Sequence, residues 1–169
     1  HAQAEEKRVS NLEIVQTDLL AYAPETRFDA MVFCLFGRTE DTLRIARKQC
    51  RRKIFLVKSD YSHHRFSAGK VSLGEYTAGS TENVLREKGI PYTVERFTAE
   101  FGQPFRSLEA AERFFALYNR SRSETLSKDE IKARLTAGPS AEFPYYLPHE
   151  KALCLFTIET AAISKEEAV

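Results

Sequence analysis

Apolar residues fall into short runs along the chain, and most of these runs have the length of a β-strand. Residues 30–36 (AMVFCLF) are continuously apolar, which suits a strand buried on both faces of a parallel sheet. Residues 54–57 (IFLV) predict the next strand. Residues 12–17 predict an earlier strand, because Leu12, Ile14 and Val15 include the β-branched types that favour strands.

Helical patterns separate these strands, and two further strands follow late in the chain. Helices are predicted from Thr39, where acidic residues occupy the first turn, and over residues 81–88, where Gly89 follows. Two later helices carry serine caps, and the second has Glu three residues after its serine, a capping box. These helices span residues 107–118 and 127–135, and the late strands span residues 92–97 and 152–159.

The order of strands and helices is that of an α/β fold. In such sheets, ligands bind at the carboxyl ends of the parallel strands, called here the ligand edge. Asp18 follows the strand 12–17 and is therefore expected at the ligand edge. Asp29 precedes the strand 30–36, so we expect it at the opposite edge in a structural role.

Length and charge limit the classes of protein that fit. The 169 residues are enough for one domain over residues 1–163, followed by a polar tail over residues 164–169. A net charge of +1 argues against a nucleic-acid partner and against attraction to anionic lipid. A basic run over residues 44–53 is interpreted as a solvated helix face and C-terminal turn, with a phosphate or RNA contact as the alternative.

The cysteines indicate a reducing compartment, most simply the cytoplasm. The chain has three cysteines, Cys34, Cys50 and Cys154, which is an odd number. They are far apart in sequence, and their spacing does not resemble that of a zinc site. The apolar run 30–36 is too short to span a bilayer, and the chain does not begin with a secretory leader pattern. We therefore expect no membrane partner and no metal.

Five segments carry a family resemblance: IVQTDLL (14–20), RFDAMVFCLFG (27–37), RKIFLVKS (52–59), YTVERF (92–97) and ALCLFTIE (152–159). In this order and spacing they resemble the class I S-adenosylmethionine-dependent methyltransferases. The resemblance implies a Rossmann-like sheet of order 3-2-1-4-5-7-6 with helices on both faces and an antiparallel late strand pair. It covers about residues 9–100 and returns at residues 152–159.

The resemblance also implies roles for individual residues. In the family, an acidic residue ending the third strand bonds the adenine amino group of S-adenosylmethionine, and an apolar residue follows it. These positions correspond to Asp18 and Leu19. The far end of the fourth strand lies beside the methionine portion of the cofactor, which implies contacts from Phe33, Cys34 and Leu35.

The chain departs from the family at the cofactor loop. None of its seven glycines forms a GxGxG cluster, and the acidic residue that holds the ribose hydroxyls is absent. The chain thus resembles the C-terminal two-thirds of a methyltransferase, truncated at its N-terminal side, and should bind the cofactor weakly or not at all. We expect one of three outcomes. The 169 residues are part of a longer natural protein, a second chain completes the sheet as a homodimer, or residues 12–17 pair with residues 30–36.

Candidate substrate-pocket residues follow the strand 54–57. Tyr61 could shape a pocket, and His63 or His64 could act as a general base toward an acceptor; the alternative is an exposed polar loop. Cys34 is interpreted as a packing residue rather than a nucleophile, since methyl transfer from a sulfonium is a direct displacement. The aromatic segment from Glu100 through the helix 107–118 would cover the substrate pocket, pack on the sheet, or do both.

Two function classes remain open at this point. The first is transfer of a methyl group to an unidentified small-molecule or protein acceptor by the full-length protein. The second is a non-catalytic α/β module whose sheet edge and aromatic helix mediate self-association or partner binding. A nucleotide-binding oxidoreductase is a third option, although its Gly-rich fingerprint is also missing.

Overall fold

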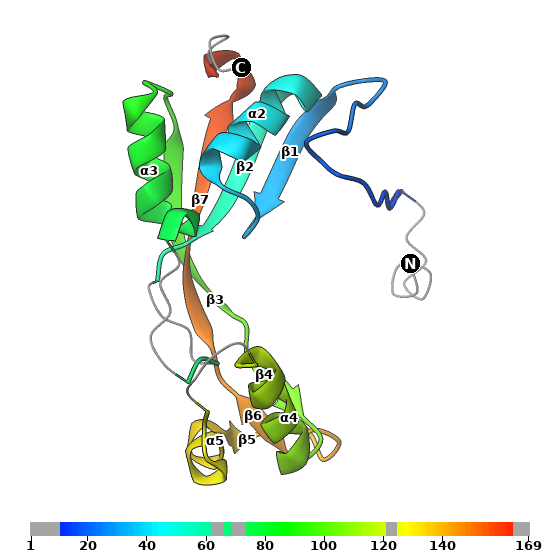
Figure 1. Cartoon of the computed structure of the whole chain (residues 1–169), viewed down its shortest axis with the longest axis vertical. Helices are drawn as coiled ribbons and strands as arrows, with labels where there is room; N and C mark the ends of the chain where they lie inside the picture. Colours follow the sequence, from blue (N-terminus) through cyan, green and yellow to red (C-terminus); the bar gives the residue numbers. More distant parts are fainter. Residues whose placement is uncertain (1–10, 62–65, 69–73, 121–124, 164–169) are drawn as a thin grey trace.

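Four strands form the larger of two sheets in the computed structural model, which describes residues 11–61, 66–68, 74–120 and 125–163. The strand order is β1-β2-β7-β3 (Figure 1). β1 and β2 are parallel, whereas β7 is antiparallel to both β2 and β3. The strands are β1 (Phe28–Cys34), β2 (Cys50–Ser59), β3 (Thr93–Glu100) and β7 (Glu150–Glu159).

This order is the one that the resemblance implies for the second half of a methyltransferase sheet, 4-5-7-6. The predicted α/β class and the antiparallel late strand pair are confirmed. The register places alternate residues of neighbouring strands on one face. Phe33 lies beside Leu56, which lies beside Phe156, and all three are buried.

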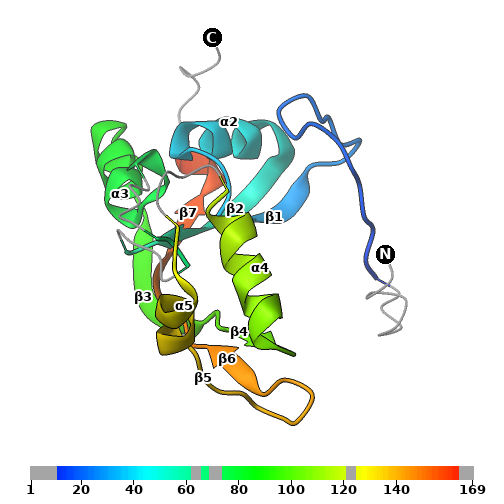
Figure 2. The same cartoon turned by 60° about the horizontal axis from the view of Figure 1, so that its bottom comes forward.

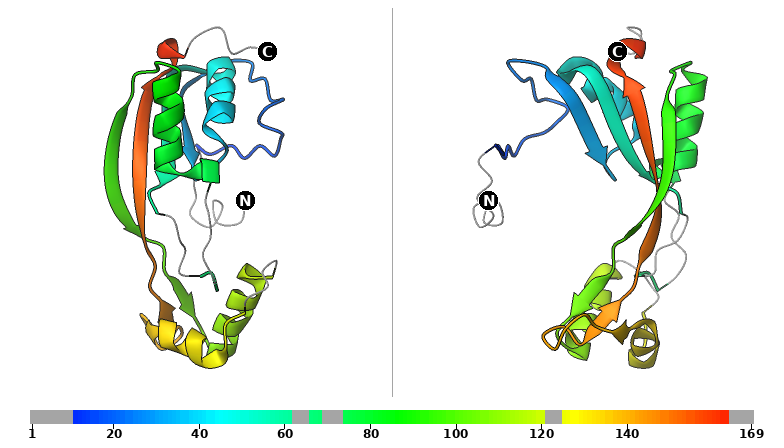
Figure 3. Two further views of the ribbon diagram at one scale, coloured as in Figure 1. Left: turned by 60° about the vertical axis from the view of Figure 1, so that its left-hand side comes forward. Right: turned by 180° about the vertical axis from the view of Figure 1, so that it is seen from behind.

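Two helices cover this buried face of the larger sheet. They are α2 (Thr39–Gln49) and α3 (Ala78–Glu87), and a hydrogen bond of 2.9 Å between the Thr39 and Thr81 hydroxyls joins them. Figure 3 shows both helices on the same side of the sheet. The resemblance implied helices on both faces of the sheet. In the described part of the chain, α2 and α3 cover one face.

The main hydrophobic core lies between the larger sheet and these helices. Leu43 of α2 and Leu85 of α3 are fully buried against Ile54, Leu56 and Phe156 of the strands. Burying an aliphatic side chain of this size contributes roughly 1.5–3 kcal/mol each. The short helices η1 (Gly74–Tyr76) and η2 (Thr160–Ala162) flank this core.

A second, smaller lobe is inserted between β3 and β7. Both long strands run from the larger sheet toward this lobe (Figures 1 and 2). Its own hydrophobic cluster centres on Phe105, Phe115 and Leu147. The lobe contains a sheet of order β4-β6-β5 and two helices: β4 (Gln103–Phe105), α4 (Leu108–Tyr118), α5 (Lys128–Arg134), β5 (Thr136–Ala137) and β6 (Tyr145–Leu147).

The predicted serine caps are confirmed in this lobe. Ser107 accepts a hydrogen bond from the Ala110 amide at the start of α4. Ser127 and Glu130 form the complete capping box of α5. Each cap satisfies a backbone amide that the first helical turn leaves without a partner.

The predicted strand over residues 12–17 is wrong. This segment is exposed and belongs to no strand in the described structure, and it does not pair with β1. An extended segment becomes a strand only when a neighbouring strand satisfies its backbone groups, and residues 12–17 are not paired with any strand of the described structure.

The prediction that residues 30–36 are buried on both faces is also wrong. β1 is an edge strand, and the Val32 side chain is 66% exposed. Cys34 is likewise exposed rather than packed, whereas Cys154 is buried as expected. None of the helices in the described ranges is long and apolar enough to cross a membrane.

Candidate functional site

The ligand edge is formed where β1 and β2 end side by side. Cys34, the last residue of β1, is paired with Val57 of β2. The backbone then turns through residues 35–38 into α2, which begins at Thr39. We call residues 35–38 the exit loop. It occupies the position at which open α/β sheets bind their ligands.

The exit loop carries unusual backbone geometry. Leu35 has φ of 50° and Gly37 has φ of 63°, and Leu35 is the one non-glycine residue with positive φ in the described ranges. For a residue with a Cβ atom, this conformation costs about 1–2 kcal/mol. Backbone outliers of this kind cluster at functional sites, which supports the exit loop as a candidate site.

Lys58 is hydrogen-bonded to the exit loop from the buried side of the sheet. Its side chain is 1% exposed, and its Nζ donates hydrogen bonds to the carbonyl oxygens of Phe36 (3.2 Å) and Gly37 (2.7 Å). The Leu35 amide also bonds the Val57 carbonyl at 2.9 Å. Burial lowers the pKa of Lys58 to about 8, and the negative charge of Glu40 opposes this shift.

Sequence reasoning missed Lys58, although strand periodicity could have found it. Successive residues of a strand point to opposite faces, so Lys58 shares a face with Ile54 and Leu56. Those two residues are fully buried. A lysine in phase with a buried apolar row is uncommon, and it marks a position where the cation has a specific partner.

The predicted methionine-side residues differ in their exposure. Phe33 is buried in the main core, with its ring 6.3 Å from that of Phe36. Cys34 and Leu35 are exposed, so they are the members of this set that a ligand could reach directly.

The structure does not bring Asp18 and Leu19 to the exit loop. Asp18 forms a turn, in which its carboxylate accepts the Leu20 amide at 2.9 Å. The Gln49 side chain at the end of α2 donates to the Leu19 carbonyl at 2.7 Å. Gln49 precedes Cys50, which pairs with Phe28 at the start of β1, so this turn lies at the opposite end of that strand.

The geometry at Asp18 is that of a carboxylate that stabilises a turn, and its role as an adenine ligand stays a prediction. Asp29 lies at the start of β1, as predicted. It forms an ion pair of 2.7 Å with Arg51. The hydrogen bond from Arg51 lowers the pKa of the Asp29 carboxyl.

Of the predicted substrate-pocket residues, Tyr61 is described, while His63 and His64 lie outside the described residues. Tyr61 is half-buried, and its ring lies 6.2 Å from the ring of His149, measured between centroids. His149 is 3% exposed and lies 4.7 Å from the Phe66 ring. His149 is remote from Tyr61 in the sequence, and only the tertiary fold places the two rings together.

Glu100 fixes the backbone beside His149 where the two lobes meet. Its carboxylate accepts the His149 amide and the Tyr146 hydroxyl, each at 2.8 Å. These hydrogen bonds lower the pKa of Glu100, and the bond from the His149 amide has the largest effect. The pKa of Tyr146 is raised because its hydroxyl proton is held by the carboxylate.

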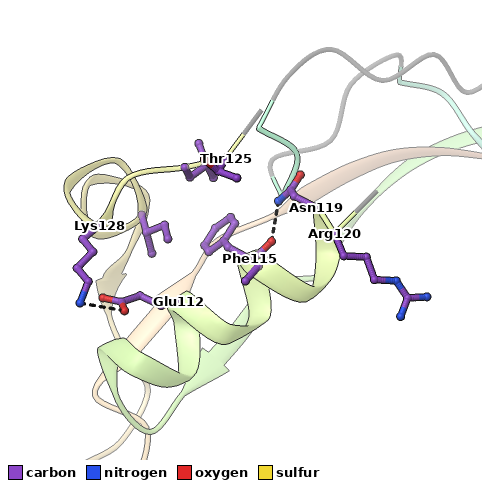
Figure 4. Close-up of a pocket in the computed structure, with 9 residues that line it drawn as sticks. Glu112, Phe115, Asn119, Arg120, Thr125 and Lys128 are labelled. Carbon is purple, nitrogen blue, oxygen red and sulfur yellow. Dashed lines mark hydrogen bonds and ion pairs between the residues drawn. The ribbon is translucent and has the colours of Figure 1, made fainter. Parts of the chain in front are cut away.

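A pocket of about 370 Å³ lies between α4 and α5, in the second lobe (Figure 4). The Phe115 and Ile131 side chains supply apolar walls, and an ion pair of 3.3 Å between Lys128 and Glu112 lies at its rim. Its size is at the lower end of the range for small-molecule sites. It lies on helices of the second lobe rather than at the ligand edge.

Metal-binding geometry is not present in the residues that the structure describes. Within them, no group of three or more His, Cys, Asp or Glu side chains is arranged to hold a metal ion.

Comparisons with known proteins give structural similarity alone. No family model and no curated protein matches the sequence. Among solved structures, the YcgJ protein of Bacillus subtilis matches 93% of this chain and 75% of its own, at 12% identity and a TM-score of 0.47. BH2331 of Bacillus halodurans, a proposed methyltransferase, matches 94% of this chain and 76% of its own, also at 12% identity and a TM-score of 0.47.

Proposed function

We propose that the protein transfers a methyl group from S-adenosylmethionine to an unidentified acceptor. The observation that carries the proposal is the strand order β1-β2-β7-β3, with β7 antiparallel between β2 and β3. This is the order of the second half of the methyltransferase sheet. The strained exit loop at the carboxyl end of β1 supports the same interpretation.

In this proposal, the exit loop borders the methionine portion of the cofactor. Cys34 and Leu35 offer it exposed side chains, and Phe33 supports them from the core. Asp18 and Leu19 would contact the adenine only if their turn moved toward the ligand edge. Transfer from a sulfonium needs orientation of the acceptor and exclusion of water more than it needs a protein nucleophile.

The acceptor side of the site is assigned to Tyr61, His63 and His64. Tyr61 follows β2 closely, so it lies on the ligand-edge side of the sheet. A neutral histidine there would accept a proton from an acceptor hydroxyl or amine. The acceptor is a small molecule or a protein, and the near-neutral net charge argues against a nucleic acid.

The test is a titration of S-adenosylmethionine into the isotope-labelled chain, followed by amide NMR shifts. The sequence has no Gly-rich loop, so we expect weak binding, with the largest shifts at Leu35 and Gly37. Leu35→Asn keeps a residue that tolerates positive φ but removes the apolar contact, and it should weaken binding about tenfold, or ~1.4 kcal/mol. Leu117→Asn is the matched control, because Leu117 is 65% exposed on α4.

The NMR shifts also separate the alternative sites. Shifts confined to α4 and α5 would assign the ligand to the second-lobe pocket and overturn the proposal for the exit loop. An absence of shifts at high ligand concentration would overturn it as well. The variant Asp18→Ala, titrated in the same way, tests the adenine contact. If Asp18 contacts the adenine, this variant should bind S-adenosylmethionine more weakly than the parent chain.

A non-catalytic binding module is the second candidate function, and the β1 edge favours it. β1 presents an open backbone edge in the described structure, and Val32, Leu35 and Phe36 are exposed there. Such an edge can pair with a strand from another chain. This function predicts concentration-dependent association of the chain.

A further inference from the structure

We infer that Lys58 is a positioning residue for the cofactor site, holding the exit loop in its ligand-binding conformation through the Phe36 and Gly37 carbonyls. The inference rests on the proposed function. Lys58 does not touch the ligand in this account, because its side chain is 1% exposed and lies beneath the loop.

The first argument is geometric. The exit loop contains two residues with positive φ, and Leu35 is one for which this conformation is strained. Strain of this kind persists only where surrounding bonds hold it. The Lys58 Nζ supplies two of these bonds, at 3.2 and 2.7 Å, and both are to the loop itself.

The second argument is energetic. A charged donor bonds a carbonyl roughly twice as strongly as a neutral one, and the effect is larger in a site without water. A buried ammonium group costs stability relative to a buried apolar side chain. A lysine in the buried row of β2 therefore needs a role that compensates for this cost. The role that the contacts offer is to fix the loop carbonyls.

The third argument concerns the groups around the ammonium. Glu40, in the first turn of α2, acts on it through its negative charge. Cys154 of β7 lies beside Lys58 in the sheet register, and burial raises the pKa of this thiol to about 11. Since the pKa of Lys58 is about 8, the amine can lose its proton while Cys154 stays neutral.

The first test uses the ligand-free chain and the methyl NMR signals of Leu35 and Val57. Deprotonation of Lys58 weakens its bonds to the loop, so these signals should titrate with a midpoint near pH 8. The titration should be absent in Lys58→Met. It should persist in Lys53→Met, whose exposed lysine lies in the same strand and is paired with Glu159 at 3.1 Å. Every chain in this titration carries Cys34→Ser, so that the pH response is read without the thiol next to Leu35.

The second test measures S-adenosylmethionine binding by the parent chain and both lysine variants at pH 7. We expect at least tenfold weaker binding in Lys58→Met and an unchanged constant in Lys53→Met. Should Lys58→Met fail to fold, the parent chain supplies the same comparison without mutation, because its binding should weaken from pH 7 to pH 9.5 in step with the Leu35 signals.

The outcomes separate this inference from the proposed function. Leu35 signals that do not respond to pH or to Lys58→Met overturn the inference, whatever the binding result. A loop that responds while binding stays constant also overturns it. An absence of binding by the parent chain overturns the proposed function, and the cofactor role of Lys58 with it.

Discussion

Burial of an ammonium group gives Lys58 a measurable effect on the stability of the whole chain. The pKa of Lys58 is lowered from 10.5 to about 8, chiefly by loss of hydration. Between these two pH values, the unfolded chain binds more protons at this residue than the folded chain. Stability therefore rises with pH across this window.

We predict that the free energy of unfolding of the parent chain rises by up to about 3 kcal/mol relative to Lys58→Met between pH 7.5 and 10.5. Urea unfolding at several pH values measures this difference. The comparison with the variant is needed because Cys154, whose pKa is raised to about 11, acts in the opposite direction above pH 9. Parallel curves for the two proteins would contradict the assignment of a lowered pKa to Lys58.

Asn119 is a second residue whose contribution can be measured singly. It is 5% exposed, and its Nδ2 donates to the carbonyls of Phe66 and Phe115, each at 2.9 Å. Its Oδ1 accepts the Ala68 amide at 3.0 Å. These bonds tie residues 66–68 to the end of α4.

We expect Asn119→Ala to lower the free energy of unfolding by about 2–3 kcal/mol, because buried carbonyl and amide groups lose their partners. Asn83→Ala on the exposed surface of α3 is the control, with a change within about 0.5 kcal/mol. Chemical denaturation measures both. A change as small as that of the control would show that water satisfies the groups that Asn119 now bonds.

At the scale of secondary-structure elements, the sequence was sufficient to predict helices whose capping hydrogen bonds form within the same short segment. Ser107 and Ser127 cap their helices within three residues, so both helices could be predicted with their first turns. The second sheet was missed. Its strands are two or three residues long, which is too short for local periodicity to reveal them. Gln103 of β4 also pairs with Leu147 of β6, a residue far along the chain.

Two glycines give opposite predictions for the same substitution. A Cβ at Gly138, which follows β5, would lie 1.8 Å from the Phe143 carbonyl oxygen, and backbone cannot move aside cheaply. A Cβ at Gly79 in α3 meets nothing within 4 Å. We expect Gly138→Ala to destabilise the protein by about 1–3 kcal/mol.

Gly79→Ala is the matched variant, and it should stabilise the protein by about 0.5–1 kcal/mol because alanine restricts the unfolded chain. Thermal unfolding of the two variants beside the parent checks both signs. Equal effects from the two substitutions would mean that the loop before Phe143 adjusts its backbone freely.

At the scale of the whole molecule, the larger sheet ends in an open edge. β1 lacks a neighbour on its outer side in the described structure, and Val32 is the most exposed of its large apolar side chains. Its one charged side chain, Asp29, is already paired with Arg51. Edges of this kind are usually protected by charge, proline or a covering segment.

We predict that the chain self-associates through β1 and that Val32→Lys weakens this association at least tenfold, or ~1.4 kcal/mol. Sedimentation equilibrium over a wide range of concentration measures it. Leu117→Lys is the control, since Leu117 is equally exposed but lies on α4. A chain that stays monomeric throughout, or one that loses association through Leu117→Lys instead, would contradict the role of the β1 edge.

The α/β class, the four strands of the larger sheet, and the caps of α4 and α5 could be predicted from the sequence, because periodicity and capping act over a few residues. Tertiary structure decided three other matters. Residues 12–17 did not become a strand because a strand needs a partner. Lys58 bonds the exit loop, and His149 lies beside Tyr61, because the fold brings distant segments together. Asp18 forms a turn far from the exit loop, since its position depends on packing against Gln49 rather than on its own sequence.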